Sequence, residues 1–192
     1  MKSLLYPILI ALFLTPLTYA QTETTTPKQH PLQVASSIIH WKGHYMFQVS
    51  EHTGTVLFKE GYLLTTNGHV SGGSFVIDMT TITNPEHEER GHGPVTHLKD
   101  PDFFYVSKYP EAKLTITQVE FLEEENIHRI YANLTIKNVT KPMKFYAKVD
   151  GTTKQMTTRF KIDRTRWGIT YNNKLKDEAI SDAIEFDVTL QF

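Results

Sequence analysis

Cysteine is absent from the sequence. This excludes a disulfide-stapled scaffold, and it also excludes a lipoprotein anchored through a lipidated cysteine. The 192 residues, 40% of them hydrophobic, are enough to bury the core of one domain. The stability of that domain must therefore come from its core and from backbone hydrogen bonds.

A hydrophobic run long enough to span a membrane is also missing. The longest apolar stretch, Leu4 to Leu14, is interrupted by Tyr6 and Pro7, whereas a membrane helix needs about 20 apolar residues. Lys2 before the run and a small residue, Ala20, after it are typical of a secretory signal. We expect residues 1–20 to be cleaved near Ala20, which would make the mature protein periplasmic or secreted. No stable membrane span is expected.

An excess of positive charge is lacking as well. The chain has 20 basic and 21 acidic residues, a net charge of −1. Removal of residues 1–20 takes one lysine and no acid, which leaves 19 basic and 21 acidic residues, a net of −2. This balance argues against a nucleic-acid partner. The segment 21–35 is Thr-rich and polar, and we interpret it as a flexible linker before a domain over 36–192.

What the domain does contain is a period-2 alternation of apolar and polar residues, typical of half-buried strands. A break in this alternation near Thr117-Gln118 indicates a bulge, and Asn67-Gly68 is a strong hairpin signal. No segment has a sustained helical period. The apolar faces expected from the clearest strands are Ile130, Ala132, Leu134 and Ile136; Met143, Phe145, Ala147 and Val149; Met156, Thr158, Phe160 and Ile162; and Ile184, Phe186, Val188, Leu190 and Phe192.

These patterns predict an all-β fold of about eight antiparallel strands, a sandwich or a barrel. The number of large side chains on the apolar faces favours the barrel. A small barrel either fills its interior with side chains or leaves room for one ligand.

The segment from His97 to Pro110 does not read as a strand. Asp100-Pro101 is typical of a helix start, and two adjacent aromatics, Phe103 and Phe104, follow. We expect a short helical turn that caps the barrel as a lid, with one ring facing the interior, more readily Phe104, and the other wedged under the strands. An ordinary loop anchored by aromatics is the alternative.

Catalysis is not expected. The sequence has no G-x-S-x-G elbow. Of the carboxylates, Asp78, Asp163 and Asp182 are candidates for acid–base chemistry, but each lies in a strand pattern whose polar face should be solvated. The histidines of the loop 84–97 lie in a Gly-broken segment that cannot fix a metal site, so no metal is expected.

Several segments, in order along the chain, resemble the YceI-like family. They are His52-Thr-Gly54, Gly73-Ser-Phe-Val-Ile-Asp78, His97-Leu98 with Asp102-Phe103-Phe104 and Tyr109-Pro110, Leu134-Thr-Ile-Lys-Asn-Val-Thr-Lys-Pro142, and Ile162-Asp163-Arg164 with Trp167-Gly168. Asn138 stands where the family usually has glycine, and asparagine tolerates the same left-handed turn. The resemblance covers residues 36–192. It implies a lipocalin-like antiparallel β-barrel, exported, whose hydrophobic pore holds a polyisoprenoid or another long-chain amphiphile.

On this reading the chain carries or sequesters an amphiphilic lipid, with no cofactor beyond that bound isoprenoid or similar lipid, and at most a second copy of itself as a homodimer. The residues we expect to bind the ligand are Trp41, Phe75, Phe104, Leu114, Ile116, Ile136, Phe145, Phe160, Ile162, Arg164, Trp167 and Phe186. Two roles stay open for Arg164: an anchor for a head group, or a structural ion pair with Asp78 or Asp182. The alternative function is a filled barrel that uses the His-rich loop 84–97 as an interaction surface.

Overall fold

The computed structural model describes residues 26–45, 51–85, 94–170 and 180–192. The predicted signal, residues 1–20, lies outside them. The strands are β1 (Lys28–Pro31), β2 (Ile38–Tyr45), β3 (Glu51–Thr66), β4 (His69–Asp78), β5 (Glu111–Leu122), β6 (Ile127–Ile136), β7 (Val139–Asp150), β8 (Gln155–Asp163) and β9 (Ile180–Gln191). The helical elements are the 3-10 turns η1 (Val34–Ser36), η3 (Met79–Thr81) and η4 (Arg164–Trp167) and the short helix α2 (Pro94–Lys99).

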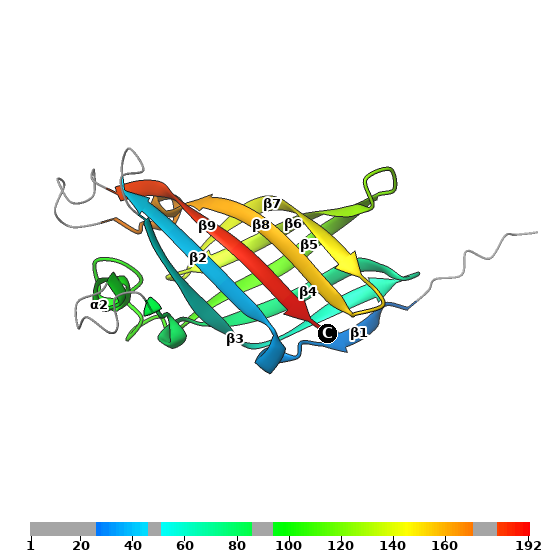
Figure 1. Cartoon of the computed structure of the whole chain (residues 1–192), viewed down its shortest axis with the longest axis horizontal. Coiled ribbons are helices and arrows are strands. Elements are labelled where there is room, and N and C mark those ends of the chain that lie inside the picture. Colours follow the sequence, from blue (N-terminus) through cyan, green and yellow to red (C-terminus); the bar gives the residue numbers. More distant parts are fainter. Residues whose placement is uncertain (1–25, 46–50, 86–93, 171–179) are drawn as a thin grey trace, which may run out of the picture.

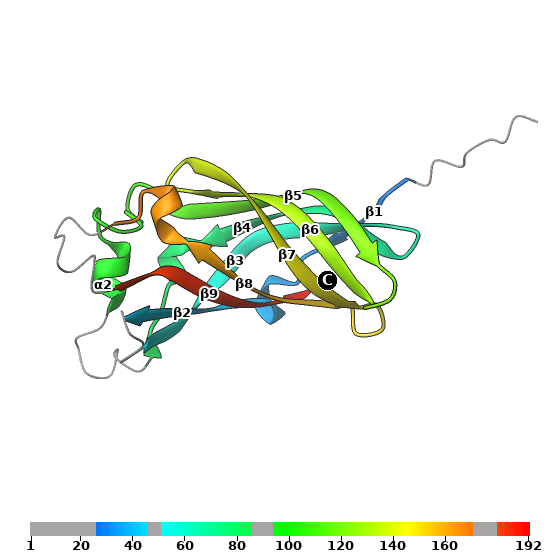
Figure 2. The ribbon, with the colours of Figure 1, turned by 90° about the horizontal axis from the view of Figure 1, so that it is seen from above.

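The strands form one antiparallel sheet in the order β1-β3-β2-β9-β8-β7-β6-β5-β4, and a pairing of β3 with β4 closes it. Strands β2 to β9 therefore make an eight-stranded barrel, as the sequence predicted, and β1 lies outside the closed ring (Figure 1). Figure 2 shows α2 and η4 at one end of the barrel, called here the α2 end, and the C-terminus at the other, the far end. No helix in the described part of the chain is long and apolar enough to cross a membrane.

Local turn chemistry explains how the strands connect. Asn67 and Gly68 both have positive φ, 53° and 82°, in the tight β3–β4 hairpin. Asn138 has φ 61° between β6 and β7, so asparagine does adopt the left-handed conformation there. The predicted bulge is present, since the β5–β6 register shifts between Ile116 and Gln118.

Two expectations were wrong. The segment Lys28–Pro31, assigned to the flexible linker, is strand β1 and pairs with β3 from Thr65 to Tyr62. Its polar composition gave no sign of this, because β3 extends beyond its partner β2 and offers a backbone edge to which any extended segment can bond. The helix expected to start at Asp100-Pro101 instead ends there: α2 runs from Pro94 to Lys99, with proline at its first position, and a turn follows.

Candidate functional site: the barrel cavity

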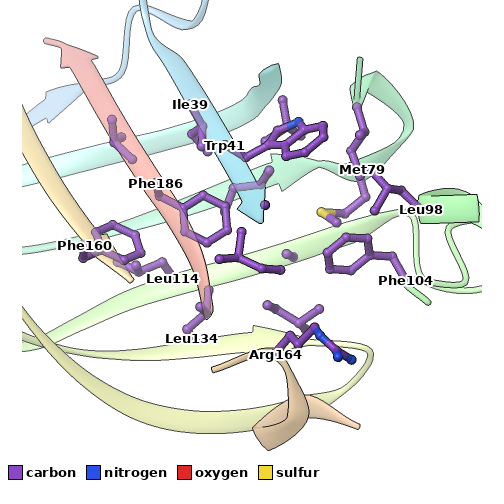
Figure 3. A pocket seen from close by; sticks show the side chains of 18 of the residues that line it. Ile39, Trp41, Met79, Leu98, Phe104, Leu114, Leu134, Phe160, Arg164 and Phe186 are labelled. Carbon is purple, nitrogen blue, oxygen red and sulfur yellow. The ribbon is translucent and has the colours of Figure 1, made fainter. Parts of the chain in front are cut away.

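The barrel encloses a cavity of about 600 Å³, within the size range of small-molecule binding sites. All eight barrel strands contribute side chains to its wall. At one end, α2 and the turn that carries Phe103 and Phe104, called here the aromatic turn, contribute as well. Figure 3 shows Trp41, Met79, Leu98 and Phe104 gathered around one part of the cavity and Phe160 and Phe186 on another. The barrel is therefore hollow, not filled by interdigitating side chains.

Most of the predicted binding residues line this cavity. They are Trp41, Phe75, Phe104, Leu114, Ile116, Ile136, Phe145, Phe160, Arg164 and Phe186. Three of these rings form a continuous row across β7, β8 and β9: the ring centroids of Phe145 and Phe160 are 5.2 Å apart, and those of Phe160 and Phe186 are 5.5 Å apart. Period-2 alternation identified the inward face of the strands, since Leu114, Ile116, Phe145, Phe160 and Phe186 all line the cavity.

Ile162 and Trp167 do not belong to the cavity wall. Ile162 is buried opposite Ile184 on β9, and Trp167, 1% exposed, donates its indole N–H to the carbonyl of Leu134 at 3.0 Å. Trp167 lies in η4, where a period of 2 does not apply. Ile162 is in phase with Phe160 on β8, but alternation only separates inside from outside. It cannot separate a residue that faces open space from one that is packed against its neighbours.

The aromatic turn contributes both of its rings to the cavity wall at the α2 end. Phe103 and Phe104 both line the cavity, with ring centroids 5.1 Å apart in an edge-to-face arrangement. The expectation that only one ring faces the interior was therefore wrong. Lys137 fixes the turn, since its Nζ donates to the carbonyl of Phe103 at 2.7 Å.

Some wall residues were missed by sequence reasoning. Ile39, Val188 and Leu190 are in phase with predicted residues and could have been found from alternation alone. Met79 in η3 and Leu98 in α2 lie in irregular segments, where no period indicates which way a side chain points.

Polar groups of the wall gather at the α2 end. Tyr45 ends β2, His52 is near the start of β3, His97 belongs to α2, and Ser181 and Arg164 lie beside the start of β9. His52 is a strand residue opposite Gly43 on β2. The cavity therefore has an apolar body and one polar end.

Arg164 is 1% exposed, and protein groups bind its guanidinium. Its Nη1 donates to the carbonyl of Ile169 at 2.6 Å and its Nε to that of Ser181 at 3.2 Å, while Nη2 lies 3.1 Å from the Asp182 carboxylate. Buried charge requires such partners. Asp78 takes no part in this ion pair, because its carboxylate accepts from the backbone N–H of Thr80.

An ion-pair network lies at the same end of the barrel. Glu185 on β9 accepts from Lys161 and lies 3.2 Å from Nε2 of His44. The hydrogen bond from Lys161, followed by that from His44, keeps the pKa of Glu185 below its ordinary value. The third candidate carboxylate, Asp163, accepts from the N–H of Thr165 and caps η4. Within the described ranges, no three His, Asp or Glu side chains are grouped as a metal site requires.

A model of the YceI-like domain matches residues 31–192. The chain belongs to the YceI-like family. Curated relatives include UPF0312 protein ECA1782 of Pectobacterium atrosepticum, 38% identical over 78 residues, and UPF0312 protein plu2095 of Photorhabdus laumondii, 40% identical over 55 residues. These matches cover 39% and 29% of this chain, and the chain spans only 38% and 28% of the length of these relatives.

Solved structures of the same architecture agree with this membership. Burkholderia cenocepacia BcnA superposes with a TM-score of 0.68 at 13% identity, over 83% of this chain and 98% of BcnA. The Campylobacter jejuni YCEI protein superposes with a TM-score of 0.55 at 21% identity, over 74% of this chain and 85% of that protein. At such identities the likeness concerns the fold, which is the YceI barrel, lipocalin-like in its closure.

Proposed function

We propose that this YceI-like chain is an exported, non-enzymatic binding protein that holds a polyisoprenoid or another long-chain amphiphile in its barrel. The observation that carries the proposal is the hollow interior, a cavity of about 600 Å³ whose body is lined by aliphatic and aromatic side chains. Burial of an apolar chain contributes roughly 0.8 kcal/mol per methylene, reduced by the costs of association and chain ordering.

The polar end supports an amphiphile rather than a plain hydrocarbon. Tyr45, His52, His97 and Ser181 supply hydrogen-bonding groups near the α2 end of the wall, whereas the hydroxyl of Thr158, in the body of the cavity, already donates to the carbonyl of Tyr146. A ligand whose head lies there and whose chain runs toward the far end leaves no polar group in the apolar body. The proposed orientation is therefore head to α2 and chain inward.

The alternative, a filled barrel that acts through loop 84–97, required an interior without free space. The cavity contradicts that requirement. Residues 86–93 of the loop lie outside the described part of the chain, and the cavity supports a ligand-holding barrel over the filled barrel.

The test is lipid extraction from the protein purified from its own host, followed by mass spectrometry. We expect a long-chain amphiphile at near-stoichiometric amount, and an N-terminus near Gln21 if residues 1–20 are removed on export. Gly43 offers a matched variant, because it lines the cavity and an added Cβ there meets no atom of the described residues within 4 Å. Gly43→Leu should fill part of the site and lose the lipid.

Gly151→Leu is the control, since Gly151 also has open space but lies in the β7–β8 turn, away from the cavity. Lipid retained equally by both variants, or no lipid in the wild-type protein, would contradict the proposal.

A further inference from the structure

The barrel wall has a break between β7 and β8. Backbone pairing between these strands extends only from Asp150↔Gln155 to Ala147↔Thr158. Toward the α2 end, β7 continues over 139–146 paired to β6 alone, and β8 continues over 159–163 paired to β9 alone. Among the described residues no strand bonds to the two facing edges, and we call this break the β7–β8 seam.

Side chains close the seam where the ladder ends. The Oγ1 of Thr158 donates across it to the carbonyl of Tyr146 at 2.7 Å. The next facing positions are Phe145 and Phe160, whose ring centroids are 5.2 Å apart and which both line the cavity. Only packed rings therefore separate the cavity from the seam at this level.

Beyond the two rings, η4 fills the seam. Trp167 is buried and reaches past β7 to the carbonyl of Leu134 on β6. Arg166 is exposed, donates to the carbonyl of Pro142 on β7 at 3.1 Å, and lies 5.4 Å from the centroid of the Trp167 ring. Figure 2 shows η4 at the end of the barrel where β7 and β8 have diverged.

The two sides of the seam hold η4 unequally. On the β9 side, the buried guanidinium of Arg164 bonds to Ile169, Ser181 and Asp182. On the β6–β7 side, the bonds come from Arg166, Trp167 and the Nζ of Lys137, which lies 3.4 Å from the carbonyl of Gly168. Opening the seam breaks side-chain hydrogen bonds and the contact between Phe145 and Phe160 but no backbone ladder, whereas opening any fully paired part of the wall breaks a backbone ladder as well.

We propose that the β7–β8 seam is a lateral portal through which the bound amphiphile enters and leaves the cavity, with η4 moving together with β8 and β9 away from β7. This inference rests on the proposed function. A lateral portal lets the part of the chain that lies beside the seam pass sideways, so the chain need not be threaded along the barrel axis past Phe103 and Phe104 at the α2 end. Arg166 is then the latch, because its bond to Pro142 is exposed and joins η4 directly to β7.

A covalent lock across the seam tests the portal. Continuing the register beyond Ala147↔Thr158 places Lys144 opposite Lys161, and both are exposed. Because the chain has no cysteine, Lys144→Cys with Lys161→Cys can be joined by a bis-maleimide without side reactions. The matched control is Lys148→Cys with Thr157→Cys, which face each other on the same strands where the ladder is intact.

The readout is stopped-flow exchange of NBD-labelled farnesol. The lock across the seam should slow both association and dissociation by at least about tenfold, and the control lock should change neither. Without any lock, Arg166→Ala should raise both rates about fivefold to tenfold and leave Kd nearly unchanged, as expected for loss of one charge-assisted hydrogen bond that only holds a path closed. Arg159→Ala is its control, since Arg159 bonds to Asp187 on β9 and not across the seam.

The outcomes separate the two proposals. Unchanged rates in the locked barrel and in Arg166→Ala would overturn the portal and place exchange at the α2 end, while binding of the probe by the wild-type protein would still support the proposed function. No probe binding by the wild-type protein would overturn both. If the paired cysteines prevent folding, the comparison of Arg166→Ala with Arg159→Ala decides alone.

Discussion

The guanidinium of Arg164 lies 3.1 Å from the carboxylate of Asp182, which joins the end of β8 to the start of β9 at the polar end of the cavity. The two side chains differ in burial: that of Arg164 is 1% exposed and that of Asp182 is 63% exposed. The structural ion pair that the sequence left open is therefore formed, with Asp182 as its partner. Arg164 also lines the cavity, but protein acceptors already bind its guanidinium there.

Replacing Arg164 should cost more stability than replacing its partner. Arg164→Leu removes the donor to two backbone carbonyls and should lower the free energy of unfolding by about 2–3 kcal/mol. Asp182→Asn keeps an acceptor oxygen at a solvated position and should cost only about 1 kcal/mol. Urea unfolding of both variants checks this. An equal loss in the two variants would mean that the ion pair, and not the carbonyl bonds, stabilises η4.

A phosphate head should bring no gain in affinity. Because Ile169, Ser181 and Asp182 already accept from Arg164, a ligand phosphate would have to displace protein acceptors to reach the guanidinium. Competition with NBD-labelled farnesol should therefore give farnesyl phosphate a Kd no lower than that of farnesol. A Kd for the phosphate lower by about tenfold or more would restore Arg164 as a head-group anchor.

Both rings of the aromatic turn should affect ligand release. Phe103→Ala and Phe104→Ala each remove a buried ring from the cavity wall, which should cost about 3–5 kcal/mol of stability and speed dissociation of the probe. Phe121→Ala is the control, because Phe121 packs between His69 and His128 at the far end and does not line the cavity. It should lower stability without changing release. Wild-type release rates in both turn variants would leave the turn as a scaffold.

Substitution by alanine should destabilise the protein at Gly54 but not at Gly43. A Cβ added at Gly54 would lie 1.8 Å from the carbonyl oxygen of Thr83 and 2.7 Å from the ring of Trp41. Gly54→Ala should therefore force the backbone and the indole apart and lower the free energy of unfolding by at least about 1–3 kcal/mol. Gly43→Ala, which meets no atom, should stay within about 0.5 kcal/mol of the wild-type protein. Thermal unfolding decides, and a tolerated Gly54→Ala would contradict this packing.

Stability should fall as the solution becomes acidic because of His128. This side chain is 4% exposed, and neither ring nitrogen has a hydrogen-bond partner among the described residues. Burial, with a smaller contribution from His69, lowers the pKa of His128 below 6.5. The unfolded chain therefore binds a proton at a pH where the native protein does not, so stability is fully present above about pH 6.5 and decreases below it.

His128→Phe should remove this part of the pH dependence, since a phenyl ring has no proton to bind. Denaturant unfolding between about pH 5 and pH 8 provides the measurement. The control is His40→Phe, because His40 is an exposed residue of β2 and does not line the cavity. A pH profile that is the same in His128→Phe and in the wild-type protein would show that other groups are responsible.

The inward face of most strands was determined by the sequence itself. Alternation at Leu114 and Ile116 on β5, and at Phe160 on β8, needs only the local geometry of a strand, and these side chains do line the cavity. Turn residues behaved in the same way: Asn67 and Asn138 adopt the left-handed conformation that their chemistry allows. The closed barrel followed from enough such strands.

Only the tertiary structure decided what depends on residues far apart in the chain. Ile162 and Phe160 share an apolar phase on β8, yet only Phe160 lines the cavity, and η4 directs Trp167 toward the carbonyl of Leu134 on β6. Arg164 found its carboxylate in Asp182 and not in Asp78, since β9 lies beside β8 and β4 does not. The β7–β8 seam also depends on residues far apart in the chain, since η4 packs between the two strands. Sequence periodicity specifies which way a side chain points from its own strand, but the distance to the next strand is set by what packs between them.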